Sequence, residues 1–171
     1  RYSLPVGSRA PGEELVGRAF SREWLDYHYD GVLWTWTYEQ RRGLFAAEVG
    51  PASSSGAGFL EVGCGLGLVT GFAAEHFGGD AVGVDLSQAV FRAQHSARAN
   101  PFLHFVQASV WNLPFPSASF DVAYSHGVLH HTWSTRQALE RLARMVAPEG
   151  SLAVWLYGPG SIRESWSRKT A

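Results

Sequence analysis

The sequence lacks several features that would otherwise define its class. It has 171 residues and one cysteine, Cys64, so no disulfide can form within the chain. This is compatible with a reducing compartment, and we expect a cytoplasmic location. No apolar stretch approaches the roughly 20 residues that a membrane-spanning helix needs, so we expect no membrane segment. The formal net charge is −1, and no basic run is present that would attract nucleic acid or an anionic membrane.

Metal-ligand patterns are missing as well. A single cysteine excludes a C-x-x-C pair, and no histidine stands with it at zinc-ligand spacing, so we expect no metal site. What the chain does contain is 46% hydrophobic and 17% charged residues. This composition is typical of one globular domain with a buried core.

The most informative stretch is residues 61–67, which read Glu-Val-Gly-Cys-Gly-Leu-Gly. A strand that ends in closely spaced glycines and turns into a helix is typical of a nucleotide-binding loop, because glycine permits positive φ and close backbone approach. The dinucleotide fingerprint G-x-G-x-x-G would require a third glycine at position 68, where the chain has Leu68. The pattern is instead an acid followed by G-x-G-x-G.

Strand and helix patterns alternate from residue 59 onward. This alternation predicts an α/β fold, a doubly wound and mostly parallel sheet with helices on both faces. Ligands of such sheets bind beyond the carboxyl ends of the strands. The predicted strands are residues 59–62, 81–85, 103–107, 120–125 and 151–157, and the predicted helices are 69–77, 87–99 and 134–146.

The N-terminal part reads differently. Residues 1–20 are rich in glycine and polar side chains and predict a loose arm, and residues 21–49 predict two helical pieces that carry many aromatic rings. We therefore divide the chain into an N-terminal helical extension (1–50), a linker (51–58) and a core (59–171). The aromatic rings either cover the crevice as a lid or pack on the sheet as core, and the sequence leaves both open.

Asp85 ends the second predicted strand, 18 residues after Gly67. A carboxylate at this position can accept hydrogen bonds from both hydroxyls of a ribose. The alternative is that Asp85 helps Ser87 to cap the following helix.

Residues 59–157 as a whole resemble the class I S-adenosyl-L-methionine-dependent methyltransferases. Residues 61–67 resemble their first motif, and similar segments follow in family order at 82–87, 107–115, 120–131 and 142–152. The small-molecule type, typified by quinone-biosynthesis methyltransferases, is the most similar subgroup. The resemblance implies the doubly wound fold and S-adenosyl-L-methionine as cofactor. The expected cofactor-binding residues are Glu61, Gly63, Cys64, Gly65, Gly67, Asp85, Leu86, Ser109, Val110 and Ser125.

The chain departs from the family in two ways. The family usually has an acid at the position of Ser109, where it accepts a hydrogen bond from the adenine amino group; a serine hydroxyl can still accept one. The family sheet normally has seven strands, of which we predict five, so we expect the chain to be incomplete at its C-terminus, without the final hairpin. His126 and His130 are the candidate general bases, because histidine titrates near neutral pH; the alternative for each is a packing role.

The expected function is transfer of a methyl group to an O, N or C atom of a small-molecule acceptor. One alternative is a methyltransferase-like binding fragment without turnover. The other is an oxidoreductase that binds a nicotinamide dinucleotide, against which Leu68 and Glu61 count. The sequence identifies neither the acceptor nor the oligomeric state.

Overall fold

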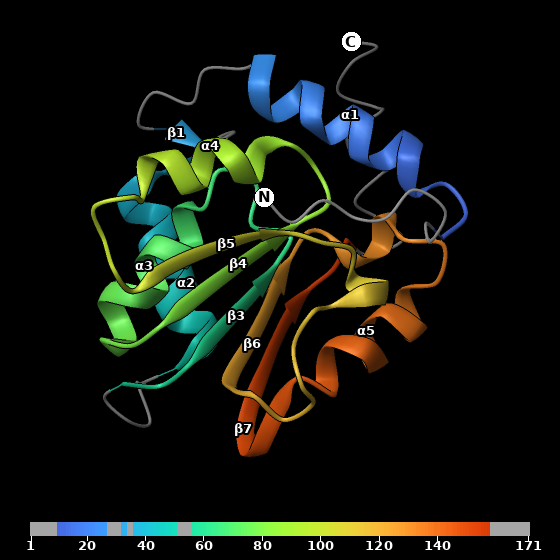
Figure 1. Cartoon of the computed structure of the whole chain (residues 1–171). Coiled ribbons are helices and arrows are strands. Elements are labelled where there is room, and N and C mark those ends of the chain that lie inside the picture. Colours follow the sequence, from blue (N-terminus) through green and yellow to red (C-terminus); the bar gives the residue numbers. More distant parts are fainter. Residues whose placement is uncertain (1–9, 27–31, 34–35, 51–55, 158–171) are drawn as a thin grey trace, which may run out of the picture.

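The computed structural model describes residues 10–26, 32–33, 36–50 and 56–157. A five-stranded sheet in the order β5-β4-β3-β6-β7 forms its centre (Figure 1), and every neighbouring pair is parallel. The chain winds outward from β3 first to one edge and then to the other, which confirms the predicted doubly wound fold. The strands are β3 (Phe59–Val62), β4 (Ala81–Asp85), β5 (Leu103–Gln107), β6 (Phe120–His126) and β7 (Val146–Trp155).

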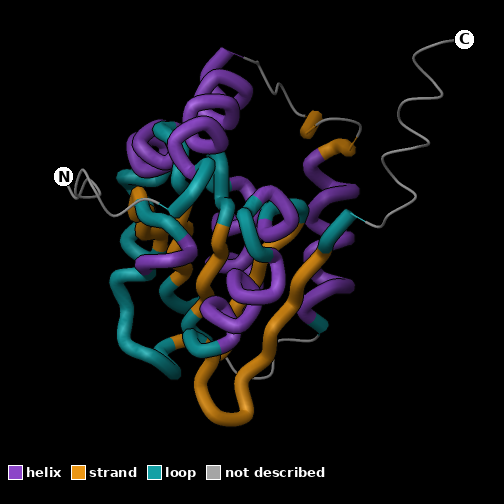
Figure 2. The backbone as a smooth tube through the Cα atoms, turned by 90° about the vertical axis from the view of Figure 1, so that its right-hand side faces the viewer, coloured by secondary structure: helices purple, strands orange, loops and turns teal. Residues whose placement is uncertain are grey.

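Helices lie on both sides of the strands (Figure 2). The core helices are α3 (Leu68–Phe77), α4 (Ala89–Ser96) and α5 (Thr135–Ala143), with short 3-10 turns η1 (Val110–Asn112) and η2 (Leu129–His131). The N-terminal elements are α1 (Glu13–Asp26), β1 (Val32–Leu33), β2 (Trp36–Thr37) and α2 (Tyr38–Val49).

Each face of the sheet has its own apolar core. On one face, α2 and α3 pack on the strands through buried aromatic rings, among them Phe45, Phe59 and Phe77. On the other face, α5 and the turns pack through buried side chains such as Leu129 and Leu142. Burial on both faces explains why β3 and β4 are mainly apolar, with the acids Glu61 and Asp85 as the exceptions near their carboxyl ends.

Local signals fix two helix starts. Thr37 caps α2, because its hydroxyl accepts from the Gln40 amide at 3.2 Å while the Gln40 side chain accepts from the Thr37 amide at 2.9 Å. Ser134 caps α5 in a similar way, because its hydroxyl accepts from the Gln137 amide at 3.4 Å.

The prediction of a loose arm over residues 1–20 is wrong from Glu13 onward, where α1 begins. Gly12 and Gly17 suggested a loop, but Val16, Phe20 and Trp24 recur every four residues and therefore lie on one side of a helix. All three line a cavity at the carboxyl ends of the strands. Contact with the rest of the protein thus overrides the low helix propensity of glycine.

The last strand also begins earlier than predicted, at Val146 and not at residue 151, and α5 ends before Met145. The sequence places residues 148–150 in the connection between the predicted helix 134–146 and the predicted strand 151–157. They form an irregularity inside β7 instead, since the register moves from Phe120 opposite Val146 to Val122 opposite Ser151. Glu149 adopts a φ of 65° there, which is how the extra residues are accommodated.

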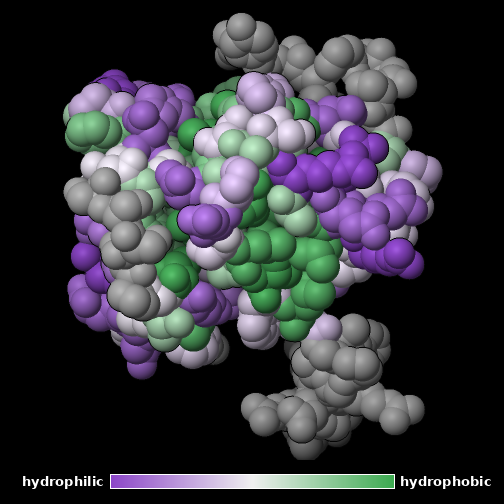
Figure 3. All heavy atoms as spheres, turned by 90° about the horizontal axis from the view of Figure 1, so that it is seen from below, coloured by the Kyte–Doolittle hydropathy of each residue, from purple (hydrophilic) through white to green (hydrophobic). Residues whose placement is uncertain are grey.

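β7 is the outer strand of the sheet within the described part of the chain. The strand itself exposes large apolar side chains, including Leu152 and Trp155, which are 36% and 41% exposed. Apolar side chains also gather on the face of the molecule seen from below (Figure 3).

Candidate functional site

Two cavities lie where the parallel strands end. The first, which we call the α1 cavity, has a volume of about 340 Å³ and is lined by α1 together with residues at the ends of β4, β5 and β6. The second, the α2 cavity, has a volume of about 330 Å³ and is lined by α2, the glycine loop and Trp155. Trp24, Gly63 and His126 line both cavities, so the two spaces meet at the glycine loop.

The glycines of the loop are required for two different contacts. Gly65 has a φ of 52°, and a Cβ atom there would come within 2.7 Å of the Trp24 ring. Gly67 has a φ of 79°, and a Cβ atom there would come within 2.5 Å of the Phe105 ring. The first glycine lets α1 approach the loop, and the second lets α3 begin against β5.

Asp85 ties the glycine loop to the end of β4. Its side chain is buried, and its two oxygens accept from the backbone amides of Gly65 and Ser87, each at 2.7 Å. Asp85 and Leu86 both line the α1 cavity. Because a carboxylate has about four acceptor positions, Asp85 can hold these amides and also face a ligand.

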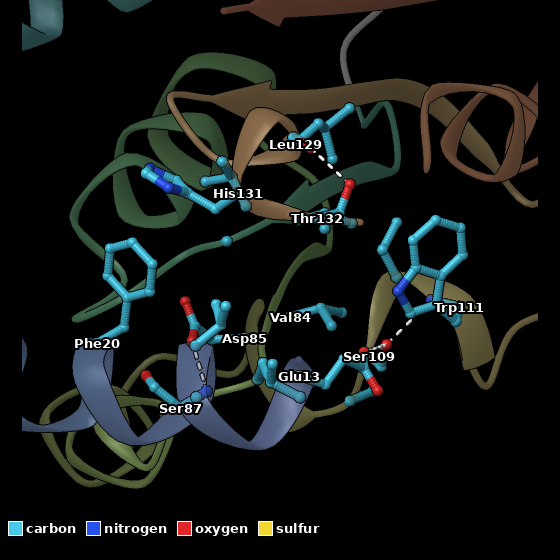
Figure 4. A pocket seen from close by; sticks show the side chains of 18 of the residues that line it. Glu13, Phe20, Val84, Asp85, Ser87, Ser109, Trp111, Leu129, His131 and Thr132 are labelled. Atoms are coloured by element: carbon cyan, nitrogen blue, oxygen red, sulfur yellow. Dashed lines mark hydrogen bonds between the residues drawn. The ribbon is translucent and has the colours of Figure 1, made fainter. Parts of the chain in front are cut away.

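Ser109 and Val110 line the far part of the α1 cavity. The Ser109 hydroxyl accepts from the Trp111 amide at 3.1 Å and donates to the carboxylate of Glu13. Figure 4 shows Glu13 and Ser109 side by side, with Asp85 further along the cavity. Glu13 carried no signal in the sequence, because it lies in the segment predicted as a loose arm.

Glu61 lies beneath the glycine loop and lines the α2 cavity. It is 5% exposed and accepts from the Thr70 hydroxyl at 2.6 Å. Burial raises the pKa of Glu61 from 4.5 to about 7, although the Thr70 hydrogen bond and the charge of Arg41 both favour its ionised form.

A buried polar network lies at the floor of the α2 cavity and was not predicted. Arg41 of α2 donates to the Tyr124 hydroxyl at 2.7 Å, and that hydroxyl donates to Glu48. Glu48 also lies 3.0 Å from Nδ1 of His126 and 3.7 Å from Nη1 of Arg41. These last two nitrogens are buried and make no hydrogen bond of good geometry among the described residues, so Glu48 acts on both mainly through its charge.

His126 ends β6 and stacks flat on the Trp155 ring, with ring centres 4.5 Å apart. Burial and the charge of Arg41 lower the pKa of His126, although Glu48 opposes this. His130 lies in η2, where burial and His131 lower its pKa to about 4. His130 is absent from the lining of both cavities, so only His126 of the two candidate bases is brought to the site.

Three other predicted residues have identifiable contacts. Ser125 is buried and donates to the Val62 carbonyl at 2.9 Å, which links β6 to β3. Cys64 lines the α2 cavity, and burial raises the pKa of its thiol well above the usual value, which keeps it protonated. Gly67 serves helix packing, as described above.

Within the described ranges, no three His, Cys, Asp or Glu side chains are grouped to hold a metal ion. A search of the same residues finds no helix with the length and apolar character needed to cross a membrane.

The strand order, the glycine loop after β3 and the acid at the end of β4 together define a Rossmann-like α/β protein. The methyltransferase domain family matches residues 60–154, more than half of the chain, and the protein belongs to this family. The predicted family is thereby confirmed, while the narrower resemblance to quinone-biosynthesis methyltransferases stays a prediction.

Two relatives define how far the similarity extends. An uncharacterised methyltransferase of Mycobacterium tuberculosis is 36% identical over 104 residues, which cover 61% of this chain and 52% of the relative. A malonyl-acyl-carrier protein O-methyltransferase of Pseudescherichia vulneris is 30% identical over 152 residues, which cover 89% of this chain and 57% of the relative. The chain therefore spans little more than half the length of these relatives.

Two solved structures share the fold. The geranyl diphosphate C-methyltransferase of Streptomyces coelicolor, solved with S-adenosyl-L-homocysteine bound, is 14% identical with a TM-score of 0.71, over 88% of this chain and 66% of that one. The (4+2)-cyclase SpnF is 23% identical with a TM-score of 0.71, over 90% of this chain and 61% of that one. At such identities the likeness extends to the fold and not to the reaction.

Proposed function

We propose that this protein uses S-adenosyl-L-methionine to methylate a small-molecule acceptor. The observation that carries the proposal is the pair of cavities that meet at the glycine loop, with Asp85 on one side and Glu61 on the other. The α1 cavity suits the nucleoside: Asp85 can accept from ribose hydroxyls, and Leu86 and Val110 offer apolar surface for the base. The bound adenosylhomocysteine of the S. coelicolor enzyme supports this choice of ligand.

The α2 cavity suits the amino-acid end of the same ligand. That end carries a carboxylate and an ammonium, and the cavity lining contains the guanidinium of Arg41 together with the carboxylate of Glu61. Arg41 is 6% exposed, and its Nη1 atom has no hydrogen bond among the described side chains. A carboxylate placed there would satisfy a buried donor that otherwise carries a desolvation cost.

When bound, adenosylmethionine supplies a methyl group activated by its sulfonium. The protein contributes positioning and the exclusion of water, which are the main requirements of an in-line displacement. Trp24, Trp36 and Tyr38 line the α2 cavity. Trp36 and Tyr38 are 43% and 40% exposed, which favours the lid interpretation over a place in the core. Three other rings of the predicted lid, Tyr27, Tyr29 and Trp34, lie outside the described residues.

His126 is the residue best situated to remove a proton from a hydroxyl acceptor, because it lines both cavities. Its lowered pKa favours the neutral imidazole that a general base requires. We expect the ring signal of His126 in a two-dimensional NMR titration, assigned with a His126→Asn variant, to titrate below pH 6.5. Titration of that signal above pH 7 would count against this role.

Calorimetric titration tests the cofactor. We expect S-adenosyl-L-homocysteine to bind and NAD to give no heat, and the opposite result would overturn the proposal. Asp85→Asn should weaken binding by about 2 kcal/mol, roughly 30-fold, since it replaces a charged acceptor of two ribose hydroxyls. The matched control is Asp80→Asn, an exposed acid paired with His104 just before the same strand, which should leave the affinity unchanged.

Asp85→Asn should also lower the melting temperature, because the side chain holds two backbone amides. Affinities are therefore compared at a temperature at which both variants are fully folded. A fall in stability with unchanged affinity would make Asp85 a purely structural residue.

A methyltransferase-like binding module without turnover is the second candidate. The observation that favours it is Ser109, which stands where the family usually has an acid and which donates its single proton to Glu13. Binding of adenosylhomocysteine, together with no transfer of labelled methyl to a panel of phenols, amines and carboxylic acids, would select this candidate.

A further inference from the structure

Glu13 is a buried carboxylate in the wall of the α1 cavity. It opens α1 and is only 8% exposed, although glutamate is almost never this buried unless it is paired. An acid in the first turn of a helix needs no burial to interact favourably with the helix dipole. Glu14, the next residue, illustrates this: it points outward and pairs with Arg18, with both side chains more than half exposed.

Two hydrogen bonds hold the carboxylate of Glu13 in the wall of the cavity. One oxygen accepts from the Ala10 amide at 2.7 Å, and the other accepts from the hydroxyl of Ser109 at the end of β5. This contact joins residues 96 positions apart in the chain. Figure 4 shows the carboxylate beside Ser109, on the part of the cavity wall that α1 contributes.

This end of the cavity presents hydrogen-bond acceptors to a ligand and no free side-chain donor from Glu13 or Ser109. A carboxylate is an acceptor only, and the Ser109 hydroxyl uses its single proton on Glu13. A ligand group that contacts Glu13 must therefore donate a hydrogen bond, and a carbonyl oxygen there would meet another acceptor. Such a surface distinguishes a purine that carries an amino group from one that carries a carbonyl.

We propose that Glu13 receives the exocyclic amino group of the adenine and so makes the site selective for 6-amino purines. This inference rests on the proposed function, because it takes the nucleoside of S-adenosyl-L-methionine as the occupant of the α1 cavity. Glu13 then compensates for the serine at position 109. The carboxylate that the family usually has after β5 comes here from α1, which is far away in the sequence.

The test compares two ligands by calorimetry: S-adenosyl-L-homocysteine and its deaminated analogue S-inosyl-L-homocysteine, which has a carbonyl in place of the amino group. We expect the unaltered protein to prefer the amino ligand by about 10- to 100-fold, the range for a hydrogen bond to a charged group. Glu13→Gln should bring the ratio to within about threefold, because an amide can both donate and accept. Glu14→Gln, one residue along the same helix, should keep the original ratio.

The outcomes separate the two proposals. If neither ligand binds the unaltered protein, the proposed function fails. If both proteins bind with the same ratio, the role of Glu13 is wrong. Equal weakening of both ligands in a Glu13→Gln protein that keeps its melting temperature would also overturn the inference, since it would mean that Glu13 holds α1 in place without reading the base.

Discussion

Replacing Glu48 with alanine is expected to lower the free energy of unfolding by about 3 kcal/mol. Glu48 faces the guanidinium of Arg41, which is only 6% exposed, and it accepts from the Tyr124 hydroxyl. Removing one partner of a buried ion pair leaves the other charge without compensation, which costs about 3–5 kcal/mol. The lower end applies here because Glu48 itself is 19% exposed. Urea denaturation followed by circular dichroism measures the change.

A matched control compares this buried ion pair with an exposed one. Glu75 pairs with Arg42 at 2.8 Å, but both side chains are about half exposed, so Glu75→Ala should cost less than about 1 kcal/mol. The double variant Arg41→Leu with Glu48→Leu should recover much of the lost stability, since it removes both charges together. Equal effects of Glu48→Ala and Glu75→Ala would mean that the buried network contributes no more than a surface pair.

The second large effect concerns pH. Burial raises the pKa of Glu61 in the folded protein from 4.5 to about 7, so the folded state favours the protonated form. The stability that this contributes is fully present below about pH 4.5 and is lost as the pH rises through 7. A pKa difference of about 2.5, at about 1.36 kcal/mol for each unit, corresponds to about 3 kcal/mol.

Glu61→Gln should therefore be about as stable as the unaltered protein at pH 4 and more stable by about 3 kcal/mol at pH 8. Thermal unfolding at several pH values measures the difference between the two proteins. Thr70→Val should move the midpoint of that difference to higher pH, because the Thr70 hydroxyl favours the ionised carboxylate. Stability curves that run parallel from pH 4 to pH 8 would contradict the raised pKa.

Local patterns were sufficient for the centre of the fold. The predicted ranges of β3, β4 and β5 agree with the structure residue for residue, since each is a short, mainly apolar segment bounded by turn residues. In such sheets the carboxyl ends of the parallel strands meet at one edge. This rule places Glu61, Asp85 and Ser109 in one region without any knowledge of contacts. Where the local signal was mixed, as at residues 148–150, the irregular strand was read as a boundary because a bulge and a loop share the same residue types.

The missed residues of the site have a common cause. Arg41, Glu48 and Glu13 lie on N-terminal helices, and their partners Tyr124, His126 and Ser109 are at least 76 residues away in the chain. No periodicity or spacing encodes such a pairing. A buried charge also looks like any exposed charge in a sequence, so its significance appears only when the packing is known.

The packing of Phe45 on the sheet affects where the shortest fragment that folds on its own would begin. The family match begins at residue 60, but Phe45 is 1% exposed and its ring lies 5.8 Å from that of Phe59 and 5.6 Å from that of Tyr124. A chain that began at residue 60 would lack α2 and Phe45. The aromatic surface of the sheet would then be exposed and prone to self-association. The segment that matches the family model is therefore shorter than the segment that folds cooperatively. Helix α2 belongs to the folding unit although it lies outside the matched segment.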